Sequence, residues 1–293
     1  MSVIDLLQTS PLIFTVLIGI LGLLVGSFLN VVIARLPVML EREWQAQCDE
    51  NIDRSEQSTF NLMTPRSCCP HCGHMISAIE NIPVISFLFL AGKCRECKNA
   101  ISLRYPFTEL LTCILSVVVA MQFGFSWQAA AALLLTWSLI ALSGIDFDHQ
   151  LLPDNITLPV CWAGILINIP GVFTDLQASV IGAAAGYLSL WMVYHVFKLI
   201  TGKEGMGYGD FKLLALLGAW MGWQMLPFII IKQLVGIMLT PDHCANERVM
   251  VFETGSWSLE TGLGGCTVPC HIPATPDKNS AHCMAAASLE SFL

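Results

Sequence analysis

The stretch WQAAAALLLTWSLIALSGID, residues 127–146, decides the fold class of this chain. It contains no charged residue before the final Asp146. A run of about 20 such residues is long enough to cross the hydrocarbon core of a bilayer as a helix. Because an ionisable side chain at that depth is costly, it marks a functional site by default. The stretch therefore predicts a membrane-spanning helix that ends on a functional carboxylate.

A second carboxylate occupies a similar setting in GMGYGDFK, residues 205–212. The glycines at 207 and 209 favour a turn with positive φ that a substrate strand can approach closely. Two carboxylates at close range share a proton, and such a pair can activate a water and protonate a leaving amine. We therefore predict that Asp146 and Asp210 are a catalytic pair for peptide hydrolysis without a metal, with Gly207 and Gly209 as the substrate loop.

The alternative for each of these aspartates is a structural role at a helix end. Asp154 and Asp210 both stand where they could cap a following helix. Capping aspartates greatly outnumber catalytic ones, so Asp148 and Asp154 are assigned to this role. For Asp146 with Asp210 the surrounding motifs favour the catalytic interpretation.

The composition places the chain in a membrane. Of its 293 residues 55% are hydrophobic and 12% are charged, with a mean hydropathy of +0.65, whereas soluble domains carry about 25% charged residues. The net charge of -8 and the lack of a basic stripe exclude a nucleic-acid partner. We predict an all-α polytopic fold with about six spanning helices, at residues 11–35, 105–123, 127–145, 155–173, 178–200 and 212–231.

Four regions follow from these segments. Residues 1–35 form the first transmembrane helix, and residues 36–104 form a polar cytoplasmic loop region. Residues 105–231 form the transmembrane core, and residues 232–293 form an atypical polar tail that we predict to be disordered. Within the loop region the apolar segment Ile79–Ala91 is too short to span and is interpreted as a hairpin or interfacial segment.

The positive charges give the orientation of the helices. Eight of the fourteen Lys and Arg residues lie between Arg35 and Arg104, and three more lie near the start of the last helix. Because such charges collect on the cytoplasmic side, the N-terminus is predicted to lie outside. Two crossings separate Asp146 from Asp210, so both are predicted to lie on the cytoplasmic face, where they are able to meet.

Two Cys-x-x-Cys pairs predict a metal site in the loop region. Cys69 and Cys72 form the first pair, and Cys94 and Cys97 form the second, 21 residues further on. This spacing is typical of a tetrahedral four-thiolate zinc site, which would be closed and hence structural. A reducing cytoplasmic location agrees with thiolates rather than disulfides. The alternative is a set of free thiols or a redox pair.

The chain resembles the type IV prepilin peptidases, membrane aspartyl proteases of the GxGD class. The resemblance rests on residues 26–37, 39–44, 104–109 and 146–159, on the two cysteine pairs, and on 205–223. It implies that Asp146 and Asp210 are the catalytic aspartates. It also implies that the enzyme cleaves the basic leader of prepilins and type II secretion pseudopilins after a glycine, at the bacterial inner membrane.

The same resemblance implies a second reaction in many family members. They methylate the new N-terminal amine with S-adenosylmethionine, and that activity is placed in the N-terminal region. The sequence carries no glycine-rich nucleotide fingerprint there, so no residue is assigned to S-adenosylmethionine. Nothing in the sequence assigns an oligomeric state.

The resemblance stops near Ile231, where family members continue with further apolar helices. We interpret the tail as the product of a frameshift or a replaced C-terminus. Two rival interpretations follow from it. The chain is either an inactive, truncated remnant whose aspartates are not assembled, or a non-enzymatic membrane scaffold of a pilus or secretion apparatus.

Overall fold

The computed structural model describes residues 3–48, 60–64, 66–69, 71–77, 80–202 and 207–231. The tail at 232–293, and with it the predicted disorder and the frameshift interpretation, lies outside the described residues. By contacts the chain divides into two units, and the larger comprises Met1–Glu41 with Gln57–Phe228. All contacts described below lie within this larger unit.

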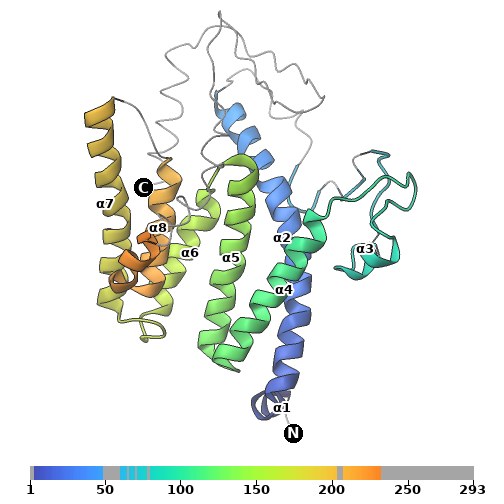
Figure 1. Ribbon diagram of the computed structural model, residues 1–293, viewed down its shortest axis with the longest axis horizontal. Coiled ribbons are helices and arrows are strands. Elements are labelled where there is room, and N and C mark those ends of the chain that lie inside the picture. Colours follow the sequence, from blue (N-terminus) through green and yellow to red (C-terminus); the bar gives the residue numbers. More distant parts are fainter. Residues whose placement is uncertain are drawn as a thin grey trace, which may run out of the picture. The chain divides into compact units, whose positions relative to one another are not determined.

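The described part of the chain is helical, as predicted (Figure 1). The helices are α1 (Val3–Thr9), α2 (Pro11–Cys48), α3 (Ile85–Phe89), α4 (Arg104–Phe123), α5 (Trp127–His149), α6 (Asp154–Ile167), α7 (Leu176–Thr201), α8 (Tyr208–Met221) and the 3₁₀ turn η1 (Trp223–Met225).

The first spanning helix is longer than the predicted 11–35. Helix α2 continues past Arg35 to Cys48, with Pro37 inside it. The extension keeps an apolar stripe, because Leu36 and Leu40 are buried in one cluster with Ile145 of α5. Burial of this stripe explains why the helix does not stop at the first charge.

Within the described residues four helices, α2, α4, α5 and α7, are long and apolar enough to cross a membrane. Helix α8 and the segment Trp223–Ile231 are long enough to cross a membrane only when they are combined. They meet at a bend of 119° and therefore form a broken span or a re-entrant loop. Gly222 lies at that bend with φ of 79°. Helix α6 has 14 residues, fewer than the roughly 20 that a full crossing needs. The six predicted spans are thus four long helices, one short helix and one broken helix.

The early end of α6 has a local cause. The prediction carried this helix to residue 173, but it ends at Ile167. Pro170 follows closely, and the residue before a proline avoids the helical region. Gly171 then turns the chain with φ of 73°.

Helix α2 packs against α4 through a row of glycines. A Cβ on Gly22 would lie 2.8 Å from Ser116 Oγ, and one on Gly26 would lie 2.7 Å from the Cα of Glu109. Small residues let helix backbones approach closely in a membrane, where the hydrophobic effect does not drive helices together. These glycines therefore fix the distance between α2 and α4.

An even closer approach joins α7 to α8. A Cβ on Gly182 would lie 2.3 Å from the carbonyl oxygen of Gly218, and one on Gly186 would lie 2.6 Å from that of Leu214. No side chain fits between these backbones. The contact places α8, which carries Asp210 in its first turn, directly on α7.

The end of α8 opposite Asp210 is held by buried polar side chains. Asn168 donates from Nδ2 to the carbonyl oxygens of Ala219 and Trp220, at 3.0 and 3.2 Å. Ser179 Oγ donates to the same Ala219 oxygen at 2.5 Å. Because the last carbonyls of a helix lack partners within the helix, these bonds satisfy them where α8 breaks.

Replacing Gly186 by Val tests the α7–α8 contact. The added side chain would collide with the Leu214 carbonyl, and such overpacking costs about 1–3 kcal/mol. We expect a clear drop in the melting temperature of the detergent-solubilised protein. Ala184→Val, at an exposed position of the same helix, is the matched control. Equal melting temperatures for both variants would show that the contact is not tight.

Candidate functional site

The two predicted catalytic aspartates lie at the same end of the helices. Asp146 is in the last turn of α5, and Asp210 is in the first turn of α8. The side chains are close enough for a coulombic interaction between the carboxylates. Both residues are exposed. The structure thus brings the two carboxylates together where water and a peptide can reach them.

The prediction that the glycines beside Asp210 form a turn with positive φ is wrong. Gly207 has φ of -77° and is the N-cap of α8, and Gly209 already lies within the helix. Neither residue has a positive φ. Gly209 is required by packing, because a Cβ there would lie 2.8 Å from Leu152 Cβ. This contact presses the α5–α6 connection against the start of α8, beside both aspartates.

Asp148 and Asp154, which were assigned a structural role at helix ends, take part in ion pairs there and do not cap a helix. The N-cap of α6 is Pro153, and Asp154 instead forms an ion pair with Lys212 of α8, with both carboxylate oxygens 2.6–2.8 Å from Nζ. Asp148 forms an ion pair with Arg104 at the start of α4. Proline takes the cap position because it ends the extended connection, which leaves Asp154 in the first turn. These two pairs tie four helix ends together around the aspartates.

Aromatic side chains fix the start of α8 on α7. Tyr208 and Phe211 are 5.7 Å apart between ring centroids, and both pack against Tyr194 of α7. Phe211 also packs edge-on against Tyr187. Phe211 is fully buried, so this cluster orients the helix turn that carries Asp210.

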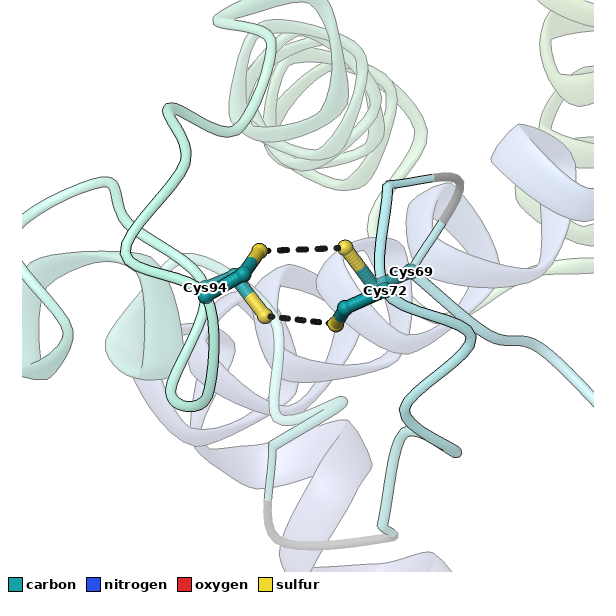
Figure 2. Close-up of side chains that lie close together, drawn as sticks. Cys69, Cys72 and Cys94 are labelled. Carbon is teal, nitrogen blue, oxygen red and sulfur yellow. Dashed lines mark hydrogen bonds between the residues drawn. The ribbon is translucent and has the colours of Figure 1, made fainter.

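The four predicted zinc ligands form a cluster in the loop region. The sulfurs of Cys69, Cys72, Cys94 and Cys97 all lie within 4.8 Å of one another. Figure 2 shows Cys94 opposite Cys69 and Cys72. The Sγ atoms lie 3.8 Å apart in Cys69–Cys97 and 3.9 Å apart in Cys72–Cys94. Ligands at a Zn–S distance of about 2.3 Å in a tetrahedron lie about 3.8 Å apart. The cluster has the size of a four-thiolate site.

The two cysteine pairs have the same backbone structure. The N–H of Gly73 donates to the carbonyl of Cys69, and the N–H of Lys98 donates to that of Cys94. Gly73 and Lys98 both adopt positive φ, of 71° and 58°. Cys68 stands outside the cluster in a β-bridge with Met75. The two turns therefore have the same conformation, and each directs its two cysteine sulfurs toward the centre of the cluster.

The pKa values of the cysteine thiols also indicate that the cluster would bind a metal cation. Backbone N–H groups of Cys72 and His71 lower the pKa of Cys69 to about 7. A backbone N–H from His74 acts to lower the pKa of Cys72, but burial and the other three thiols together raise it to about 12. Four sulfurs this close cannot all ionise alone, whereas a bound metal ion would stabilise all four thiolates.

A cavity of about 580 Å³ lies between the cysteine loop, α2 and the start of α4. Its lining is largely apolar and contains Arg35, Glu80 and Glu109. Pockets for small molecules typically measure about 300–1,000 Å³ and combine apolar walls with a few polar groups. The cavity therefore has the size and lining of a site for a cofactor.

Glu80 anchors the loop beside this cavity. Its Oε2 accepts hydrogen bonds from the N–H and the hydroxyl of Ser77, both at 2.9 Å. Arg95 lies 3.4 Å from its Oε1. These bonds, those from Ser77 first, lower the pKa of Glu80 to about 2.

The sequence analysis did not predict the cavity, and it included Glu109 in a motif without assigning it a role. Glu109 lies in the spanning helix α4 and is only 8% exposed. A signal was present, since a carboxylate inside a spanning segment is a functional candidate by default. The Asp154–Lys212 pair carried no comparable signal, because 58 residues separate its members.

Each half of the chain matches a known protein family. Residues 20–123 match the family model described as the bacterial peptidase A24 N-terminal domain. Residues 133–240 match the model of the type IV leader peptidase family. No solved structure matches the chain.

Curated relatives cover most of the chain. A protein of Stutzerimonas stutzeri named prepilin leader peptidase/N-methyltransferase is 56% identical over 82% of this chain and 84% of its own length. The protein of that name from Pseudomonas aeruginosa has the same identity and coverage. That from Neisseria gonorrhoeae is 52% identical over 80% of this chain and 83% of its own.

The low pKa of Glu80 predicts a pH dependence of stability. A carboxylate whose pKa is lowered by folding, here from 4.5 to about 2, stabilises the folded state above pH 4.5. That contribution is lost as the pH falls from about 4.5 to about 2. We expect the melting temperature of Glu80→Gln to lie below that of the unchanged protein at pH 6, and the gap to close by about pH 2.

The matched control is Glu96→Gln, an exposed carboxylate of the same loop. It should leave the melting temperature unchanged across this range. Because cysteine protonation is common to all three proteins, it cancels in the comparison. A gap between Glu80→Gln and the unchanged protein that stays constant down to pH 2 would contradict the assignment.

Proposed function

The chain belongs to the type IV leader peptidase family, and on that basis we propose that it is a membrane aspartyl endopeptidase that cleaves prepilin leaders and then methylates the new N-terminus. The observation that carries this proposal is the position of Asp146 in the last turn of α5 and of Asp210 in the first turn of α8, close enough for their charges to interact. Both residues lie in segments that match the family. Curated relatives that cover most of the chain carry both activities in their name.

Peptide hydrolysis by two carboxylates needs one in each protonation state. The ionised aspartate takes a proton from a water held between the pair, and the water oxygen bonds to the peptide carbon. The protonated aspartate then gives its proton to the leaving nitrogen as the carbon–nitrogen bond breaks. Asp146 and Asp210 supply these roles together, and because their titrations are coupled we assign neither role to one residue.

The substrate class follows from the family and from the position of the site. Prepilins and type II secretion pseudopilins carry a short basic leader before an apolar helix, and the cut follows a glycine. The ion pairs of Asp154 and Asp148 surround the aspartates at the end of the bundle where α2 carries Arg35 and α4 begins with Arg104. By the positive-inside rule this end faces the cytoplasm of a bacterial inner membrane.

The four cysteines would hold zinc in a structural role. A closed set of four thiolates leaves no coordination position for water or substrate. When bound, the ion would cross-link two turns of a loop region that has little apolar core of its own. The residues that would hold it are Cys69, Cys72, Cys94 and Cys97.

The cavity beside the cysteines is the place proposed for methyl transfer. S-adenosylmethionine, when bound, supplies an electrophilic methyl group to the pilin amine. A smaller apolar groove of about 220 Å³ adjoins the cavity and shares Ser27, Val31 and Asn81 with it. Leu24 and Phe28, which line that groove, are exposed on α2. Through it an apolar pilin segment can reach the cavity from the bilayer.

Substituting the aspartates tests the peptidase. Asp146→Asn and Asp210→Asn should each lower the rate of prepilin cleavage by about 10²–10⁴-fold, because each removes one partner in proton transfer. Asp175→Asn, at the opposite end of the bundle before α7, is the control and should cleave normally. Cleavage products of a purified prepilin are measured on gels in detergent or liposomes.

The same assay separates the rival interpretations. Cleavage by the unchanged chain, tail included, excludes both an inactive remnant and a scaffold. A chain that folds and binds zinc but cleaves nothing would overturn the proposed activity. Cleavage by both aspartate variants would overturn the assignment of the pair.

Metal analysis tests the cysteine site. We expect one zinc ion per chain by mass spectrometry of the purified protein, and its loss in Cys69→Ser and Cys94→Ser. Cys68→Ser is a matched control, because Cys68 is next to a ligand but outside the cluster. Zinc that persists in the ligand variants, or disappears in the control, would contradict the site.

A further inference from the structure

Glu109 is a buried carboxylate that neither proposed reaction uses. It lies in the second turn of α4, where the Cα of Gly26 on α2 packs against its backbone. Its Oε2 accepts a hydrogen bond of 2.8 Å from the N–H of Val84, 25 residues earlier in the chain. Through its backbone contact with Gly26 and its side-chain bond to Val84, Glu109 lies where α2, α4 and the loop meet.

Val84 has a backbone conformation that its own side chain disfavours. Its φ is 58° and its ψ is -45°. Positive φ in a β-branched residue is a genuine outlier and persists only where surrounding contacts hold it. The bond to Glu109 is the contact that holds the N–H of Val84 in this orientation.

Val84 in turn determines the wall of the cavity. It is the N-cap of α3, and its carbonyl accepts the N–H of Leu88 in that helix. Val84, Ser86, Phe87 and Leu90 all line the cavity. Glu109 lines it as well, from the opposite element. A change at Glu109 would therefore reach the cavity through the backbone of Val84.

We propose that Glu109 is a positioning residue for methyl transfer: by accepting the N–H of Val84 it holds α3 as the wall of the cofactor cavity. This inference rests on the proposed use of the cavity for methylation. It assigns Glu109 no part in cleavage, because the aspartates lie on α5 and α8. A carboxyl group suits this role because its Oε2 lies 2.8 Å from the N–H of Val84 and can accept from it.

The test measures both reactions in the full-length protein in liposomes. Glu109→Ala should raise the KM for S-adenosylmethionine about tenfold, the change expected from loss of one buried hydrogen bond, while cleavage stays within twofold. Glu109→Gln should recover most of the affinity, because its amide oxygen can still accept the N–H of Val84. Asp175→Asn should change neither reaction.

Variants on the donor side test the same bond without changing the spanning helix. Val84→Pro removes the N–H and forbids positive φ, so it should raise the KM as Glu109→Ala does. Val84→Ala keeps the N–H and removes only side-chain atoms of the cavity wall, so it should raise the KM less than Val84→Pro does. An unchanged KM in Val84→Pro would overturn the inference. Loss of cleavage together with methylation in both Glu109 variants would overturn it too, since Glu109 would then support the whole bundle.

One further variant separates this inference from the proposed function. Leu90→Trp adds bulk to the cavity wall and should block methylation. If Leu90→Trp methylates normally, the cavity is not the methylation site, and the proposed function fails at that point. If Leu90→Trp blocks methylation while Glu109→Ala and Val84→Pro do not change the KM, the inference about Glu109 alone fails.

Discussion

The backbone contact between α7 and α8 is the constraint on which the peptidase site depends. Helices surrounded by lipid gain little from burying apolar surface against one another, so their association relies on close packing and hydrogen bonds. Gly182 and Gly186 supply that packing on α7, and Gly218 supplies it on α8. This close backbone contact fixes the position of α8 along the axis of α7 and its rotation about its own axis. Asp210 then has one position relative to the rest of the bundle.

Polar contacts turn this packing into a defined site. At one end Asn168 and Ser179 satisfy the last carbonyls of α8. At the other end Lys212 pairs with Asp154, and Gly209 admits Leu152 against the helix. The α5–α6 connection is therefore held against the first turn of α8. Since Asp146 stands just before that connection, the two carboxylates are brought together by contacts that surround them.

The sequence predicted residue types and spacings well, and geometry less well. The aspartates could be proposed, and the clustering of the four cysteines predicted, because charge at membrane depth and Cys-x-x-Cys spacing each have a direct chemical meaning. The short α6 and the broken α8 were not predicted, because hydropathy measures composition along the chain and not where a helix ends. The role of Gly209 depends on a side chain 57 positions away, and no local pattern contains that information.

The two proposed reactions act on the same end of the substrate, the new N-terminus of the pilin. They depend on different helices of this chain. The aspartates depend on α5 and α8, whereas the cavity depends on α2, α4 and the cysteine loop. Asn30 Nδ2 donates to the carbonyl of Tyr105, which joins α2 to α4, and Glu109 of α4 accepts from Val84, which joins the loop to α4. The two sets of helices meet at the start of α4, because Arg104 pairs there with Asp148 of α5. The start of α4 is therefore fixed to the end of α5 that carries Asp146.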